Sequence, residues 1–164
     1  MRWLTVDPGD STGWSIWNDR ELVAAGTIPM WDFADLLWED FSDPSLRGTG
    51  LSDECYLREG YDLSVHDGPI ERIVCEDFRI YPWLARKGHL NWDSMRTPRL
   101  IGAITLICRI YGAKLVFQPA KIKERAVQGG AEELFYTPLH ENRHHNDAIM
   151  HGVFYLQEGG GSGS

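Results

Sequence analysis

The sequence contains little cysteine, no long apolar run and few basic side chains. The three cysteines, Cys55, Cys75 and Cys108, are far apart and form no Cys-x-x-Cys pair, so we expect reduced thiols and no structural zinc site. No apolar run approaches the roughly 18–20 residues that span a bilayer. The N-terminal MRWLTVDPG turns polar after six residues, too early for a secretory signal peptide. We therefore expect a cytoplasmic protein with no membrane partner.

The shortage of basic residues is uneven along the chain. The formal net charge of −8 argues against a phosphate-binding surface, because Lys and Arg drive such binding. However, residues 1–78 hold 17 Asp and Glu against 5 Lys and Arg, a balance of −12, whereas residues 79–164 hold 7 against 11, a balance of +4. The second half can therefore still present a basic face.

The size and composition fit one domain. A single core is typical of roughly 100–200 residues, and the chain has 164 residues, of which 43% are hydrophobic and 7 are Trp. The final GGGSGS, residues 159–164, resembles a flexible linker or tag remnant. We assign the domain to residues 1–158.

Apolar patterning predicts a mixed α/β fold. Three antiparallel strands are expected first, at 2–6, 14–18 and 22–28, and two more at 70–76 and 114–118. Helices are expected at 30–41, at 97–112, from Pro119 to Gly129, and at 142–157. Residues 42–68 fit neither pattern. The prediction is a five-stranded mixed sheet flanked by helices.

Three acidic residues fall where they can converge. Asp7 follows a strand, Glu76 ends another, and Asp147 lies in the first turns of the last helix. Side chains at strand ends project over one edge of a sheet. Clustered carboxylates repel one another and are usually neutralised by a divalent cation, and hard oxygen ligands favour Mg²⁺ or Mn²⁺. His144 shares a helical face with Asp147 and can supply a nitrogen ligand or move a proton.

Each of these residues also has a simpler interpretation. Asp-Pro-Gly after a strand is commonly only a turn, and an acid at a strand end is commonly solvated or capping. The segment HENRHHND can be a solvated helix entrance capped by Asn142 or Asn146. Spacing alone does not join the acids into one site.

Several segments together resemble the RuvC-like Holliday junction resolvases of the ribonuclease H-like superfamily, in particular the divergent phage forms. They are DPGDSTGW (7–14), IVCE (73–76), RLIGAI (99–104), VFQPAKIKERAVQGG (116–130) and HHNDAIMHGV (144–153). They stand in the family's order and at compatible spacing. The resemblance implies a ribonuclease H-like fold, a metal-dependent endonuclease that acts on branched DNA, and two Mg²⁺ or Mn²⁺ ions. It also implies a homodimer that places two centres on a four-way junction.

The same resemblance implies roles for individual residues. Asp7, Glu76 and Asp147 match metal-binding carboxylates, and His144 takes the place of a fourth ligand that is Asp in some members and His in others. Lys123 matches a lysine near the active centre that neutralises the attacked phosphate. A phage-encoded member would act in the cytoplasm of its bacterial host.

Residues 78–99, FRIYPWLARKGHLNWDSMRTPR, form a basic segment directly after the strand that carries Glu76. Asp93 is the only acidic residue in this segment, and its basic residues are interleaved with aromatic ones. Such a composition suits contact with phosphates and stacking on unpaired bases. The aromatic residues can instead pack in the core. The candidate DNA-binding residues are Arg79, Tyr81, Trp83, Arg86, Lys87, Arg96 and Arg99.

The chain departs from the family pattern in two places. Residues 131–143, AEELFYTPLHENR, lack a lysine-containing helix that the family has there, and residues 42–68 are hard to match. The first departure concerns part of the contact with DNA.

The leading hypothesis is a structure-selective endodeoxyribonuclease. In it Asp7 bridges two ions, Glu76 and Asp147 hold one each, and His144 adjusts the second ion or moves a proton. An actin-like or sugar-kinase ATPase also pairs Asp with Gly and Thr after a strand, but its further glycine-rich loops are missing after residue 28. Two more hypotheses are a non-catalytic DNA-binding or protein-interaction module, and a nuclease for forks, flaps or RNA–DNA hybrids.

Overall fold

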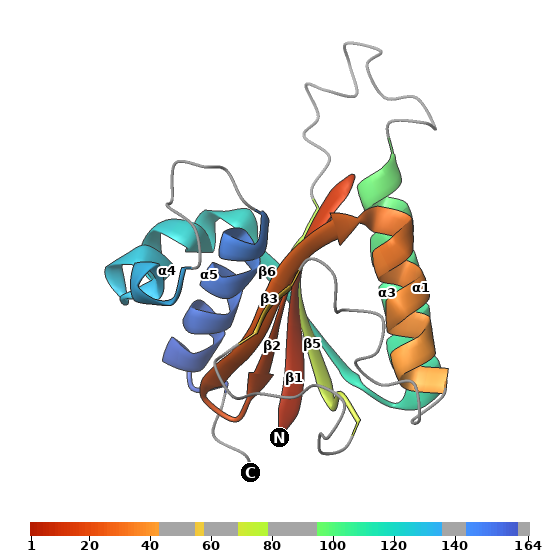
Figure 1. The fold of residues 1–164 in the computed structure, drawn as a ribbon, viewed down its shortest axis with the longest axis horizontal. Helices are drawn as coiled ribbons and strands as arrows, with labels where there is room; N and C mark the ends of the chain where they lie inside the picture. Colours follow the sequence, from red (N-terminus) through yellow and green to blue (C-terminus); the bar gives the residue numbers. More distant parts are fainter. Residues whose placement is uncertain (43–54, 58–68, 79–94, 136–143, 161–164) are drawn as a thin grey trace.

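The computed structural model describes residues 1–42, 55–57, 69–78, 95–135 and 144–160. They contain a six-stranded mixed sheet in the order β4-β3-β2-β1-β5-β6 (Figure 1). The strands are β1 (Arg2–Asp7), β2 (Ser11–Asn18), β3 (Glu21–Pro29), β4 (Cys55–Leu57), β5 (Arg72–Asp77) and β6 (Lys114–Pro119). Strands β1 to β4 pair antiparallel, whereas β5 pairs parallel with both β1 and β6.

Helices cover both faces of this sheet. Helices α1 (Met30–Ser42) and α3 (Arg96–Tyr111) lie on one face, and α4 (Lys123–Gln128) and α5 (His144–Gln157) lie on the other (Figure 1). Two short 3-10 helices, η4 (Ala120–Ile122) and η5 (Ala131–Leu134), flank α4. Within the described part of the chain, no helix is long and apolar enough to cross a membrane.

The mixed α/β prediction is confirmed, with three antiparallel strands first and helices on both faces. All five expected strands are present, and the sixth, β4, lies in the segment that the sequence pattern left unassigned. Strand β2 begins three residues earlier than expected, at Ser11, because Thr12 pairs with Ile28 of β3 and Gly13 with Asp7 of β1. The helix expected from Pro119 is instead η4 followed by α4, since β6 extends through Pro119.

The strands carry a separate apolar core on each face. Successive side chains of a strand point to opposite faces. Leu4 and Val6 of β1 therefore pack in the core under α1 and α3, whereas Trp3 packs in the core under α5. Two of the cysteines, Cys75 and Cys108, are free thiols buried in the first core, and burial raises the pKa of each.

Candidate metal centre

Strands β1 and β5 place Asp7 and Glu76 side by side. Val6 is paired with Cys75 in the parallel register, and Asp7 and Glu76 are the next residue on each strand. Because Val6 and Cys75 point into the α1/α3 core, the two acids point to the opposite face, toward α5. Asp7 is buried and Glu76 is half-buried. The register alone therefore sets two carboxylates next to each other beneath α5.

Three contacts hold the first turns of α5 against the strands. Thr5 donates from its hydroxyl Oγ1 to the carbonyl oxygen of Ala148 at 2.7 Å. The backbone N–H of His145 donates to Thr27 Oγ1 at 3.1 Å. At Gly13 a Cβ atom would lie 2.0 Å from the carbonyl oxygen of His144, so only glycine admits the helix this close to β2. These contacts bring the N-terminal end of α5 over Asp7.

The five residues predicted as catalytic are thereby gathered into one cluster. The Lys123 ammonium nitrogen Nζ lies 2.9 Å from Asp147 Oδ2, 3.1 Å from Glu76 Oε2 and 3.5 Å from Asp7 Oδ1. His144 Nδ1 lies 3.0 Å from Asp7 Oδ2. The cluster draws on β1, β5, α4 and the start of α5, which are far apart in the sequence.

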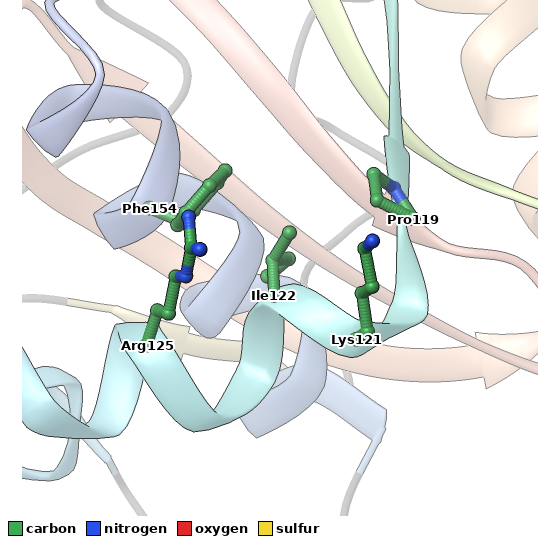
Figure 2. A pocket seen from close by; sticks show the side chains of 5 residues that line it. All are labelled: Pro119, Lys121, Ile122, Arg125 and Phe154. Atoms are coloured by element: carbon green, nitrogen blue, oxygen red, sulfur yellow. The ribbon is translucent and has the colours of Figure 1, made fainter.

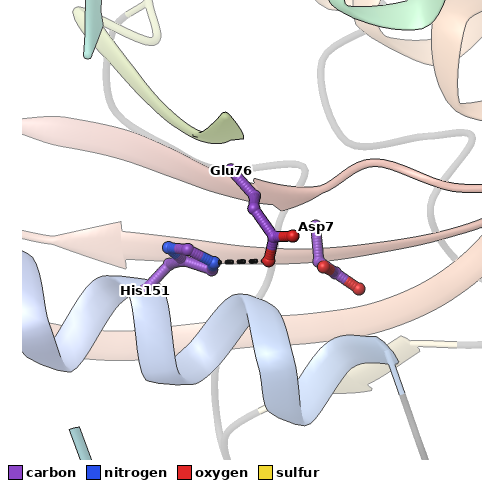
Figure 3. A group of neighbouring side chains, drawn as sticks. All are labelled: Asp7, Glu76 and His151. Carbon is purple, nitrogen blue, oxygen red and sulfur yellow. Dashed lines mark hydrogen bonds and ion pairs between the residues drawn. The ribbon is translucent and has the colours of Figure 1, made fainter. Parts of the chain in front are cut away.

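The ligand atoms of the cluster are close enough to hold cations. One group consists of Asp7, His144 and Asp147, and a second, drawn in Figure 3, consists of Asp7, Glu76 and His151. The ligand atoms of each group lie within 4.8 Å of one another. Asp7 belongs to both groups. The carboxylate oxygens suit Mg²⁺ or Mn²⁺, and an imidazole nitrogen favours the softer Mn²⁺ of the two. The residues present therefore fit a divalent-metal centre that shares one carboxylate between two positions.

The electrostatics of the cluster are uneven. Burial raises the pKa of Asp7, and the hydrogen bond from His144 and the charge of Lys123 only partly offset that effect. Burial would raise the pKa of Glu76 as well, but the hydrogen bond from His151 and the charge of Lys123 lower it to about 2. Glu76 is thus readily ionised, whereas Asp7 is held in surroundings that oppose its charge. An additional cation beside Asp7 would relieve that opposition.

The same carboxylates shift the pKa values of the two basic side chains of the cluster, Lys123 and His144. Burial would lower the pKa of Lys123, but the negative charges of Asp7, Asp147 and Glu76 raise it overall. The hydrogen bond to Asp7 raises the pKa of His144 despite partial burial. Lys123 is therefore a permanent cation between the acids, and His144 holds a proton more readily than a free histidine.

Sequence reasoning missed His151, which is fully buried on α5. Its Nε2 lies 2.9 Å from Glu76 Oε2 (Figure 3). Its Nδ1 lies 2.8 Å from Gln118 Oε1. A signal was available, because His151 stands four residues after Asp147 and seven after His144. Residues at those intervals share one face of a helix.

Only two of the predicted DNA-binding residues can be placed. Arg96 and Arg99 are exposed in the first turn of α3, and Arg96 Nη1 lies 3.6 Å from Asp10 Oδ1 in the turn after β1. Arg79, Tyr81, Trp83, Arg86 and Lys87 lie outside the described residues. The start of α3 therefore approaches the turn that follows Asp7.

A cavity of about 340 Å³ lies beside the segment that carries Lys123 (Figure 2). Ile122, Pro119 and Phe154 provide apolar walls, and the cations Lys121 and Arg125 stand at its sides. Among the described residues, neither of these two cations has an ion-pair partner. This cavity and its charges were not anticipated from the sequence.

Comparisons with known proteins agree with this architecture at the level of fold. No protein-family model and no curated protein matches the sequence. The mixed sheet with helices on both faces is a ribonuclease H-like fold, and within that class it is RuvC-like. It is similar to the structure of T. thermophilus RuvC in complex with a Holliday junction substrate, with a TM-score of 0.58, 13% identity and 97% of each chain covered. It is also similar to a Thermus thermophilus RuvC structure, with a TM-score of 0.51, 13% identity and the same coverage.

Proposed function

We propose that this protein is a metal-dependent endonuclease that cleaves branched DNA, with four-way junctions as its main substrate. The activity is assigned to one ribonuclease H-like domain over residues 1–158, acting as a homodimer. The observation that carries the proposal is the convergence of two ligand groups that share Asp7, one with His144 and Asp147 and the other with Glu76 and His151.

The chain's own residues divide the work of such a site. Asp7 would bind both cations, Glu76 would hold one of them, and Asp147 with His144 would hold the other. When bound, the two Mg²⁺ or Mn²⁺ ions would activate a water molecule and stabilise the charge that develops on the phosphodiester. Lys123 places a cation beside the carboxylates, where it can donate to an oxygen of the attacked phosphate.

The surroundings of the site favour a nucleic-acid substrate despite the acidic total charge. Lys121 and Arg125 flank the cavity next to Lys123 and lack ion-pair partners within the described residues. Arg96 stands at the turn that follows Asp7. Cations at these positions can bind backbone phosphates of a nucleic acid. The similar T. thermophilus RuvC structure contains a Holliday junction substrate, which is the reason for testing a four-way junction first.

The decisive experiment compares the wild-type protein with the Asp7→Asn variant. Both are incubated with a labelled four-way junction, a fork, a linear duplex and an RNA–DNA hybrid, in Mg²⁺ and separately in Mn²⁺. We expect paired nicks in the junction and a loss of at least about 1,000-fold in the variant, because each metal position loses its shared carboxylate. Burial opposes the charge of Asp7, so the metal-free variant should melt at or above the wild-type temperature.

Different results would favour the competing hypotheses. Cleavage of several branched substrates would indicate a broader structure-selective nuclease, and cleavage of the hybrid alone would indicate a ribonuclease. Junction binding without cleavage in either metal would favour the non-catalytic module. Full activity of Asp7→Asn would contradict the proposed metal centre.

A further inference from the structure

The His151 side chain lies between two polar residues that come from neighbouring strands. Glu76 of β5 and Gln118 of β6 are partners in the parallel register. The ring of His151 reaches both, with Nε2 at 2.9 Å from Glu76 Oε2 and Nδ1 at 2.8 Å from Gln118 Oε1. Because a carboxylate only accepts, the hydrogen in the contact with Glu76 is carried by Nε2. Nδ1 then pairs with the side-chain amide of Gln118, either as an acceptor from its NH₂ group or, in a doubly protonated ring, as a donor to its oxygen.

The burial of this group distinguishes it from the other histidine of the cluster. His151 is 0% exposed and Gln118 is 5% exposed, whereas the side chain of His144 is 39% exposed. His144 is thus open to solvent and to a ligand, while His151 is fully buried beside Glu76 (Figure 3). Both ring nitrogens of His151 already have partners, so an ion could bind it only after its contact with Glu76 is broken.

We propose that His151 is a positioning residue, which fixes the carboxylate of Glu76 as a metal ligand without itself binding the ion. Gln118 in turn fixes the plane of the imidazole ring. A glutamate has several rotatable bonds, and a buried hydrogen-bond donor restricts them to the conformation that faces Asp7. Outer partners of this kind commonly change metal affinity about 10- to 100-fold when they are removed. The inference rests on the proposed metal centre and extends it by one layer.

The test compares two replacements of His151. His151→Leu removes the hydrogen-bond donor and fills its place with an apolar side chain of intermediate size. His151→Gln retains an N–H group that can reach Glu76. Ile149→Ala is the matched control, because Ile149 is fully buried on the same helix and belongs to the apolar core. Binding of Mn²⁺ and of Mg²⁺ is measured by calorimetry on the protein without DNA, at a temperature where circular dichroism shows every variant folded.

We expect His151→Leu to weaken the binding of both ions by a similar factor, about 10- to 100-fold. His151→Gln should recover most of that loss, and Ile149→Ala should bind ions like the wild type. If His151→Leu does not fold, Gln118→Leu replaces it and should give a smaller weakening of the same kind. Wild-type affinity in His151→Leu, or in Gln118→Leu where that variant replaces it, would overturn the proposal.

Two further results have distinct meanings. A loss much larger for Mn²⁺ than for Mg²⁺, without recovery in His151→Gln, would overturn the positioning role and make His151 a direct ligand, since imidazole favours the softer ion. A wild-type protein that binds Mn²⁺ but cleaves no nucleic acid would contradict the proposed function. The ion-binding comparison would still support His151 positioning if the predicted order of affinities were found.

Discussion

The two faces of the central sheet are built from alternate residues of the same strands, and they differ sharply in chemistry. Toward α1 and α3, β1 presents Leu4 and Val6, and β5 presents Ile73 and Cys75, all buried in one apolar core. Toward α5, β1 presents Thr5 and Asp7. On the same face β5 ends in Glu76, and β6 carries the buried Gln118.

The contrast separates stability from chemistry along a single strand. The α1/α3 face is stabilised mainly by apolar burial, although Thr12 and the indole Nε1 of Trp14 are also buried on that side of β2. The α5 face buries ionisable groups as well, and these require charged or hydrogen-bonding partners. Functional sites commonly trade stability for activity in this way. Substitutions on the apolar face should therefore reduce stability more than cleavage, and substitutions on the α5 face should reduce cleavage more than stability. The largest predicted effect concerns the apolar face.

Ile104→Ala should lower the free energy of unfolding by about 3 kcal/mol, because a fully buried isoleucine of α3 leaves a cavity. A loss of that size corresponds to a melting temperature about 6–12 °C lower for a domain of this length. Nuclease activity measured well below melting should stay close to wild type. Thermal denaturation and a low-temperature cleavage assay check the two parts. A normal melting temperature with lost cleavage would contradict the contrast between the faces.

Gly13→Ala should damage the α5 face instead. The added Cβ would meet backbone atoms of His144 at 2.0 and 2.2 Å, so the start of α5 must move away from β2. Displacements of about 1 Å can reduce activity about 100-fold. We therefore expect Gly13→Ala to lower the cleavage rate by a factor of that order, and to lower the free energy of unfolding less than Ile104→Ala does. Cleavage rate at saturating metal is the measurement.

Gly102→Ala is the matched control for that substitution. Gly102 is exposed in α3, and a Cβ there would meet nothing within 4 Å. It should leave cleavage unchanged and stabilise the protein by up to about 1 kcal/mol, because alanine is the better helix former. Equal activity in the two glycine variants would show that the close approach of α5 does not position the site.

Much of this architecture was accessible from the sequence because it depends on local patterns. Periodicity predicts all five long strands and the helices, and alternation along β1 explains why Asp7 faces away from Leu4 and Val6. Strand β4 was missed because it has only three residues and pairs with a distant part of the chain. Elements this short are specified by tertiary contacts more than by their own sequence.

The candidate site shows the same division. The strand ends carrying Asp7 and Glu76 are local features, and the 144/147 spacing on a helix is local as well. The contact between His151 and Glu76 depends on how α5 packs against β1, β2 and β5, which no short segment encodes. The cavity between Pro119 and Phe154 likewise needs two segments that meet only in the folded chain.

Replacing both Lys121 and Arg125 by alanine should weaken DNA binding by about 10-fold near 0.1 M salt. The log–log slope of affinity against salt should fall by about 2, since each phosphate contact contributes about 1. Cleavage at saturating DNA should be retained, because neither residue belongs to the metal groups. Fluorescence anisotropy across a salt series measures the slope.

The control for this pair removes the same charge from a different part of the molecule. Arg109 is exposed in the last turn of α3, and Lys114 is exposed at the start of β6, the opposite end of that strand from Pro119. The double variant Arg109→Ala/Lys114→Ala should keep nearly the wild-type slope. Equal slopes for the two double variants would indicate that only net charge matters and that the cavity is no DNA contact.

The smallest expected effect is the pH dependence of the metal-free protein. The hydrogen bond to Asp7 raises the pKa of His144 above 6.5, its ordinary value, so the folded state favours the protonated ring. This stabilisation is fully present below about pH 6.5 and is lost as pH rises through the pKa of the folded state. His144→Asn should therefore lower the unfolding free energy more at about pH 6 than at about pH 9. Because the His144 side chain is 39% exposed, the difference should be below about 1 kcal/mol.

Urea denaturation in EDTA measures this difference in unfolding free energy. Glu76 does not contribute in this pH range because its pKa is about 2. An equal loss at both pH values would mean that the His144–Asp7 contact stabilises the fold without a charged imidazole.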